Sequence, residues 1–159
     1  MWMADGTKLS GKYGTWNGHE YELRSTDPMR GLIYLVQEGG ESPGPEWKRH
    51  DYGERFPGPA VAYTLGVPPE DVTDIHAVTA TGELRPWRVM EIHAEDTEGN
   101  LAVVVGNDFS AEQRMDLVED HGFHTFHNEP VQRSAVFGWL PASMIHNIKS
   151  KVRWRKDAN

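Results

Sequence analysis

Asn17-Gly18 lies between two segments in which apolar and polar residues alternate. Asn-Gly is the preferred pair for a type I′ turn, because both central residues of that turn adopt positive φ. A two-residue turn fixes the register of the strands that it joins, so we expect Trp16 opposite His19 and Gly14 opposite Tyr21. Gly14 would then leave room for the Tyr21 ring to lie across it. The N-terminal part of the chain is therefore predicted to form an antiparallel hairpin.

Turn residues recur along the rest of the chain, with 16 glycines and 10 prolines in 159 residues. Such frequent turns favour short strands over long helices. Four prolines between residues 52 and 69 predict an irregular connector. The apolar segments predict strands at 31–36, 47–50, 75–79, 87–94, 101–105, 135–140, 144–148 and 151–155.

One helix is predicted near residues 111–120. Ser110 and Gln113 have the spacing of a capping box, in which each side chain satisfies the backbone N–H of the other residue. Gly122 is suited to the position just past the helix end. The residues expected on the buried side are Ala111, Met115 and Val118.

These patterns together predict a mainly β protein made of two SH3-like or partly open barrel units. We expect an N-terminal β unit at 1–56, a connector at 57–78, and a C-terminal unit at 79–159 that carries the helix. A single β-sandwich is the alternative fold.

The chain has no cysteine, and its 24 acidic and 16 basic side chains give a formal net charge of −8 at pH 7. The absence of cysteine excludes disulfides, thiolate metal sites and thiol nucleophiles. The acidic balance argues against nucleic-acid binding, which requires a basic footprint. No stretch approaches the ~20 apolar residues of a membrane span, and no leader pattern opens the chain. We expect a cytoplasmic protein that does not contact membranes.

No established catalytic motif is present: the sequence lacks a nucleophile elbow, a zinc-protease helix motif, and a glycine loop followed by Lys-Ser/Thr. Asp71, Asp74 and His76 lie close together in sequence, but a solvated turn explains them equally well. We therefore predict a protein that is not an enzyme and needs no cofactor.

Three histidines, His121, His124 and His127, form the densest cluster of metal-ligating side chains. A spacing of three places strand neighbours on opposite faces, and Gly122 makes a continuing helix doubtful. Only a loop would gather all three imidazoles. A metal-binding protein or metal-dependent enzyme that uses these histidines is thus the alternative functional prediction.

The six tryptophans divide into two groups by position. Those within predicted strands, Trp16, Trp87 and Trp139, are expected in the core. Trp47, which follows a Pro-Gly loop, and Trp2 and Trp154, which lie near the chain ends, are the candidates for exposure. Exposed aromatic side chains often mark recognition surfaces.

The segment Gly138-Trp-Leu-Pro-Ala-Ser-Met-Ile145 resembles the closing segment of SH3 domains, in which a short 3₁₀ turn leads to the last strand. Met144 stands where peptide-binding SH3 domains carry an aromatic residue, so recognition of proline-rich peptides is not implied. The pattern from Gly11 to Leu23, the central strands, the short helix and Gly138-Trp139 also resemble small bacterial immunity proteins of polymorphic toxin systems. This resemblance implies two small β-barrel-like units and a role in neutralising a toxin.

The first functional prediction is therefore a cytoplasmic protein-binding module, an immunity protein that occludes the active site of a basic toxin domain. Acidic side chains on loops would meet the basic cleft and speed association. The candidate contacts are Glu38, Glu41, Asp96 and Glu98, with Trp47 as an anchor. A structural or adaptor domain within a larger assembly is a third possibility.

Overall fold

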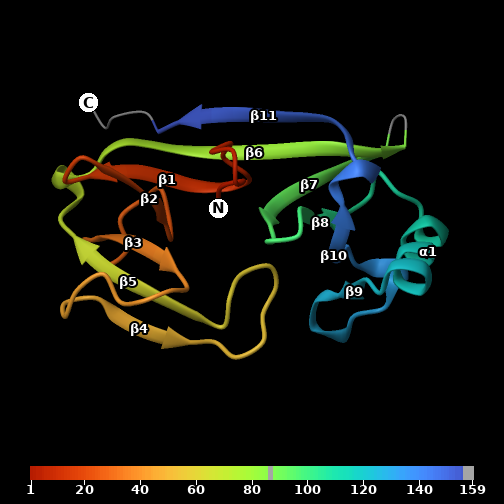
Figure 1. Cartoon of the computed structure of the whole chain (residues 1–159), viewed down its shortest axis with the longest axis horizontal. Helices are drawn as coiled ribbons and strands as arrows, with labels where there is room; N and C mark the ends of the chain where they lie inside the picture. Colours follow the sequence, from red (N-terminus) through yellow and green to blue (C-terminus); the bar gives the residue numbers. More distant parts are fainter. Residues whose placement is uncertain (86–87, 156–159) are drawn as a thin grey trace. The chain divides into compact units, whose positions relative to one another are not determined.

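The structure, a computed structural model, describes residues 1–85 and 88–155 (Figure 1). Its contacts divide into two compact units. Residues 11–78 and 152–155 form the first, which we call the hairpin unit. Residues 1–10 and 79–151 form the second, which we call the helical unit. The structure thus groups residues 1–10 with the second half of the chain, whereas the sequence placed them in an N-terminal unit.

The hairpin unit is an antiparallel sheet in the order β4-β5-β3-β2-β1-β6 (Figure 1). Its strands are β1 (Gly11–Trp16), β2 (His19–Leu23), β3 (Ile33–Glu38), β4 (Lys48–Asp51), β5 (Val61–Val67) and residues 73–78 of β6 (Thr73–Arg85). A 3₁₀ turn, Pro69–Asp71, precedes β6.

The predicted Asn-Gly hairpin is confirmed. Asn17 and Gly18 have φ of 49° and 78°, and Trp16 pairs with His19 as Gly14 pairs with Tyr21. The space over Gly14 is filled differently from the prediction, because a Cβ there would lie 2.8 Å from Val72 Cγ1 and 3.0 Å from Leu23 Cδ1.

The predicted irregular connector is wrong in its central part, where β5 pairs with both β3 and β4. The prolines that suggested irregularity flank this strand and leave residues 61–67 able to pair. The core of the hairpin unit gathers side chains from four strands, from the residue before β4 and from the turn before β6: Leu23, Ile33, Leu35, Trp47, Tyr63, Val67, Val72 and Ile75.

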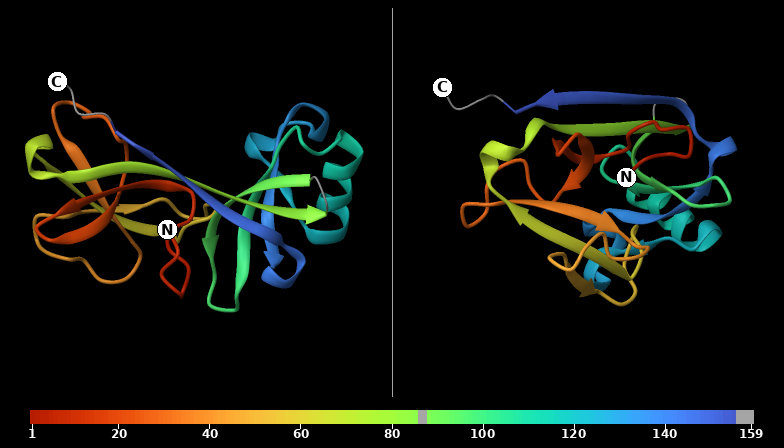
Figure 2. Two further views of the ribbon diagram at one scale, coloured as in Figure 1. Left: turned by 90° about the horizontal axis from the view of Figure 1, so that it is seen from above. Right: turned by 60° about the vertical axis from the view of Figure 1, so that its left-hand side comes forward.

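The helical unit is an antiparallel sheet in the order β6-β7-β8-β10-β9, formed by residues 79–85 of β6, β7 (Arg88–Glu95), β8 (Asn100–Val105), β10 (Val136–Pro141) and β9 (His124–Thr125). Helix α1 (Ala111–His121) packs beside β10 (Figure 2). Short 3₁₀ turns occupy Phe126–Asn128, Val131–Arg133 and Ala142–Met144. The last strand, β11 (His146–Trp154), pairs with β6.

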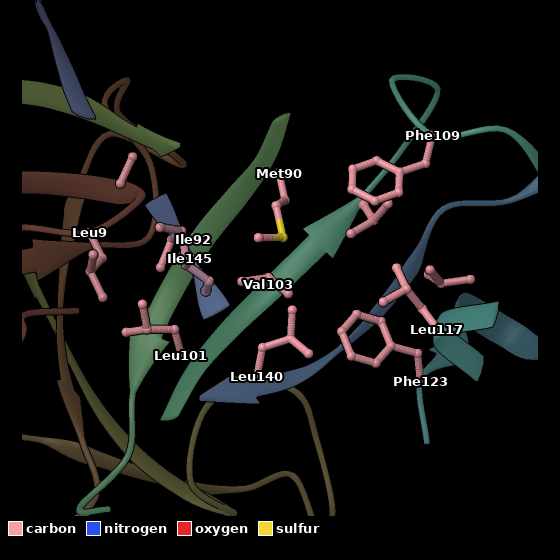
Figure 3. Close-up of a cluster of buried hydrophobic side chains, with 13 residues drawn as sticks. Leu9, Met90, Ile92, Leu101, Val103, Phe109, Leu117, Phe123, Leu140 and Ile145 are labelled. Atoms are coloured by element: carbon pink, nitrogen blue, oxygen red, sulfur yellow. The ribbon is translucent and has the colours of Figure 1, made fainter. Parts of the chain in front are cut away.

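The core of the helical unit extends from Leu9 and Ile145 at one end to Leu117 and Phe123 beside α1 at the other (Figure 3). Ser10 shows why the first ten residues belong here. Its hydroxyl accepts a hydrogen bond from the Ala80 N–H (2.8 Å) and donates one to the Ala80 carbonyl (3.2 Å).

The predicted helix is confirmed together with both of its ends. The Ser110–Gln113 capping box is present, and Gly122 adopts the left-handed conformation at φ 69°. Its buried side differs from the prediction, because Arg114 and Leu117 are the buried residues. The spacing of apolar residues does not predict a buried Arg114, because Arg114 is charged and its guanidinium is buried by hydrogen bonds to main-chain carbonyls.

The expected fold class, mainly β with one short helix, is confirmed by these elements. A 3₁₀ turn at Ala142–Met144 precedes the last strand, β11. No helix among residues 1–85 and 88–155 is long and apolar enough to cross a bilayer.

Candidate functional site

The predicted anchor Trp47 is buried, only 8% exposed, in the core of the hairpin unit. Its ring centroid lies 5.8 Å from that of Tyr21. The Pro-Gly loop before Trp47 is exposed, but it delivers the indole inward, so the prediction of an exposed anchor is wrong.

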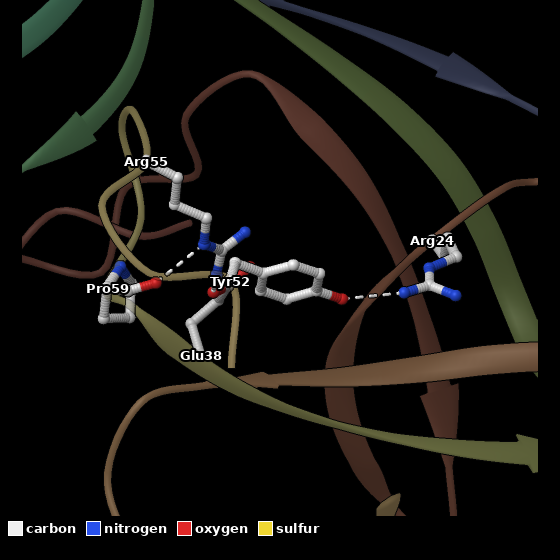
Figure 4. A network of polar contacts seen from close by, with 5 residues as sticks. All are labelled: Arg24, Glu38, Tyr52, Arg55 and Pro59. Atoms are coloured by element: carbon white, nitrogen blue, oxygen red, sulfur yellow. Dashed lines mark hydrogen bonds and ion pairs between the residues drawn. The ribbon is translucent and has the colours of Figure 1, made fainter. Parts of the chain in front are cut away.

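The predicted acids of the hairpin unit differ in their surroundings. Glu41 is exposed on the loop after β3. Glu38 is half-buried and pairs with Arg55 in a network around Tyr52 (Figure 4). Arg55 also donates to the Pro59 carbonyl (2.7 Å) and lies over the Tyr52 ring, 4.6 Å from its centroid. These contacts join the loop before β5 to the end of β3. The carboxylate of Glu38 therefore has a structural role within the hairpin unit.

A buried carboxyl, Glu22, lies beside this network and was not identified from the sequence. It lines a pocket of about 190 Å³ within the hairpin unit, where it is 9% exposed. Burial raises its pKa, and the negative charge of Glu38 acts in the same direction, whereas Arg55 opposes them. Strand pairing places Tyr13, Glu22, Val36 and Thr64 in one row across the sheet. The sheet face opposite the apolar core is therefore polar and also largely buried.

His76, considered with Asp71 and Asp74 for acid–base chemistry, is also buried in the hairpin unit. Its Nδ1 lies 2.6 Å from the main-chain oxygen of Asp74. Its ring contacts those of Tyr13 and Trp154, at centroid distances of 5.6 and 4.6 Å. These contacts give the imidazole a packing role.

The predicted acids of the helical unit lie on the hairpin loop between β7 and β8. The Asp96 carboxylate accepts hydrogen bonds from the N–H groups of Glu98 (2.9 Å) and Asn100 (2.8 Å) and from the Asn100 side chain (3.0 Å). Desolvation acts to raise the pKa of the Asp96 carboxyl. Hydrogen bonds from Asn100, Glu98 and Gly99 together have the larger effect, so the pKa is lowered. Asp96 thus shapes the loop that presents the exposed Glu98.

The three histidines of the metal prediction are exposed on three different elements. His121 ends α1, His124 lies in β9, and His127 lies in the 3₁₀ turn that follows. Across the described part of the chain, no group of three or more His, Asp or Glu side chains is arranged to hold a metal ion. The structure therefore does not assemble the predicted cluster.

An exposed group of aromatic rings occurs instead on β9, β10 and the turn between them. We call His124, Phe126, Phe137 and Trp139 the aromatic surface. The Phe126 and Phe137 ring centroids lie 4.5 Å apart, and those of His124 and Phe137 lie 6.1 Å apart. Phe126 and Trp139 are each 37% exposed.

The alternation of β10 produces this surface. Val136, Gly138 and Leu140 face the core, whereas Phe137 is half-buried and Trp139 is exposed. The prediction that Trp139 is a core residue is therefore wrong. Among the other tryptophans, Trp154 is 60% exposed as predicted, Trp16 and Trp2 are half-buried, and Trp87 lies outside the described residues.

Acidic side chains flank the aromatic surface. Strand pairing places Phe137, Val104 and Glu91 in one row, and Pro141 pairs with Asn100 at the end of the Glu98 loop. The Oε1 atom of Glu91 lies 3.3 Å from Nε2 of His93. Burial lowers the pKa of His93, although Glu91 acts in the opposite direction.

Comparison with known proteins gives one partial match. No protein-family model matches the chain, and no solved structure matches it. The Ras-related protein Rab-44 of Homo sapiens is 30% identical over 135 residues, which are 83% of this chain and 12% of that protein. The chain therefore spans about an eighth of the length of the curated relative that it matches.

The closest approach to a phosphate-binding loop is Gly6 to Lys12, where Tyr13 replaces the required Ser or Thr. The segment leads into β1, whereas a phosphate loop leads into a helix.

Proposed function

We propose that this chain is a protein-binding module, not an enzyme, and that it docks its partner on the aromatic surface of the helical unit. The observation that carries the proposal is the exposure of two large aromatic side chains, Phe126 and Trp139, on adjoining elements. Aromatic side chains are enriched at the centres of protein interfaces, where a few of them supply most of the binding energy.

The charges around this surface favour a basic partner. Glu91, Glu98 and Glu129 carry negative charge on the strand, loop and turn that flank the aromatic rings, and the whole chain has a net charge of −8. Charges at the rim of an interface steer association and help to select the partner, while the central aromatic residues slow dissociation.

The finer proposal is that the partner is a toxin enzyme with a basic active-site cleft, which the aromatic surface covers in the cytoplasm. The acidic flank and the likeness to bacterial immunity proteins support this form of the proposal. An adaptor domain would use the same surface without affecting catalysis in its partner, so an enzymatic assay separates the two.

The direct test replaces Phe126 by a photo-reactive benzoylphenylalanine in the full chain and identifies the protein that is cross-linked in source cells. The affinity of that protein is then measured for Trp139→Ala and for Trp154→Ala, which removes an exposed tryptophan from the hairpin unit. We expect Trp139→Ala to weaken binding about 30-fold or more, as for an interface hot spot. Trp154→Ala should stay within about twofold of the unmodified chain.

Equal effects of the two substitutions would contradict the aromatic surface as the docking site. If the identified protein is an enzyme, stoichiometric addition of the chain should abolish its activity, and Trp139→Ala should weaken that inhibition in parallel with binding. An enzyme that remains fully active in the complex would refute the inhibitor form of the proposal and leave the docking surface intact.

A further inference from the structure

A pocket of about 310 Å³ lies within the helical unit, on the side of α1 that faces the start of β7 and the turn before β11. Its apolar lining comes from Leu84, Phe109, Leu117 and Met144. Phe109 and Leu117 are core residues, 3% and 4% exposed, so this part of the wall is fixed by the packing of the unit. Pockets that bind small molecules combine such apolar walls with a few polar groups, and this volume suits a small ligand.

The polar groups at this pocket are mainly acidic on the helix. Asp116 and Asp120 line it from successive turns of α1. Arg88 and two histidines, His121 and His146, complete its charged and titratable lining. With neutral histidines, the formal charge of the lining is −1, from two carboxylates and one guanidinium.

The two aspartates are poorly placed for the stability of the helix itself. Like charges four residues apart repel each other, and Asp120 lies in the last turn of α1, where the helix dipole disfavours negative charge. A cation bound between them would relieve both effects. Side chains that break local rules without benefit to the fold are characteristic of binding sites.

We propose that this pocket binds a small monocation with an apolar body, an ammonium group on an aromatic ring or short alkyl chain. The ammonium would lie at Asp116 and Asp120, and the apolar body would lie against Phe109, Leu117 and Met144. The guanidinium of Arg88, which also lines the pocket, disfavours a second positive charge on the ligand. The site is independent of the proposed docking function, because no residue of the aromatic surface lines this pocket.

The test compares two ligands that share one ring and differ in charge. Tryptamine carries the ammonium, and indole-3-propionate carries a carboxylate. Each is titrated into the full chain, and the dissociation constant is taken from amide shifts in nitrogen–proton NMR spectra. We expect tryptamine to bind at least about fivefold more tightly, with the largest shifts in α1 and in the turn at Ala142–Met144.

A pair of matched double variants isolates the aspartates. Asp116→Asn/Asp120→Asn removes two negative charges from the pocket, whereas Glu112→Gln/Glu119→Gln removes two from the same helix at positions that do not line it. We expect the first pair to weaken tryptamine binding about tenfold and to abolish the preference over indole-3-propionate. The second pair should retain both affinity and preference.

Three results would overturn the proposal: absence of tryptamine binding at millimolar concentration, equal or tighter binding of indole-3-propionate, or equal losses in the two double variants. The NMR spectra also report whether each variant is folded. If the aspartate double variant does not fold, Asp120→Asn alone is compared with Glu119→Gln, under the same expectations of direction.

Discussion

The ring of Phe123 occupies the space that a side chain on Gly138 would need. A Cβ built on Gly138 would lie 2.4 Å from Phe123 Cδ1 and 2.7 Å from Cε1. Phe123 is 1% exposed, and it follows directly after the helix cap Gly122. The glycine of the Gly138-Trp139 pair therefore lets the core approach the backbone of β10 while Phe137 and Trp139 extend from its other face.

We expect Gly138→Ala to destabilise the protein by about 1–3 kcal/mol, because the added methyl group overpacks a closely filled core. Urea unfolding measures the change. Gly106→Ala is the control, since a Cβ there meets no atom within 4 Å. The control should be neutral or slightly stabilising, and an equal loss in the two variants would show that the contact with Phe123 is not the cause.

Arg114 joins α1 to two main-chain carbonyls. Its Nη1 donates to Phe109 O (2.6 Å), and its Nη2 donates to Val131 O (3.1 Å). Arg114→Lys should lower the free energy of unfolding by about 1–3 kcal/mol, because an ammonium cannot reproduce this planar fork. The exposed Arg133→Lys is the control in the same urea experiment, and a stable Arg114→Lys protein would argue against this role for the guanidinium.

His127 has φ 54° and is followed by Asn128 at φ 57°. Left-handed backbone is costly for a residue with a Cβ, so His127→Gly should raise the free energy of unfolding by roughly 1 kcal/mol. His124→Gly, in β9, should instead lower the free energy of unfolding, because glycine weakens a strand. A metal site at these histidines would instead make both variants lose stoichiometric metal, which elemental analysis detects.

Glu22 gives the protein a specific pH dependence. Its folded-state pKa is raised, chiefly by burial, so the folded state holds this proton more tightly than the unfolded state does. The contribution to stability is fully present below the unfolded pKa of about 4.3 and is lost as pH rises through the folded pKa.

Urea unfolding at several pH values, from about 4 to 8, measures this dependence in the unmodified chain and in Glu22→Gln. We expect the variant to show a flatter profile with a smaller decline at high pH. Glu41→Gln, at an exposed loop position, should follow the unmodified chain. A Glu22→Gln profile with the same decline would exclude Glu22 as its source.

The sequence correctly predicts those turns and helix ends that depend only on residues close together in the chain. The Asn17-Gly18 turn imposes its own register, and Ser110, Gln113 and Gly122 define both ends of α1 without help from distant residues. The strand β5 was missed because proline density describes the loops around residues 61–67 and not their pairing with β3 and β4.

The side chains that carry the candidate site depended on distant contacts. Trp47 turns inward because the core formed by β3 and β5 accepts it. Trp139 turns outward because Phe123, which is not its neighbour in sequence, occupies the opposite face at Gly138. A hint was present in the strand itself, since Val136, Gly138 and Leu140 form one face and leave the two bulkiest residues of β10 on the other.

Each unit is completed by residues from the far end of the chain. The other buried side chains of the core that contains Leu9 all follow position 79, Ser10 pairs with Ala80, and His76 contacts Trp154. During synthesis, Ser10 is therefore made long before Ala80, with which it pairs, and His76 is made long before Trp154. Such separation in sequence slows folding, so Leu9, which is fully buried in the folded protein, remains unpacked until the strands after position 79 have been made.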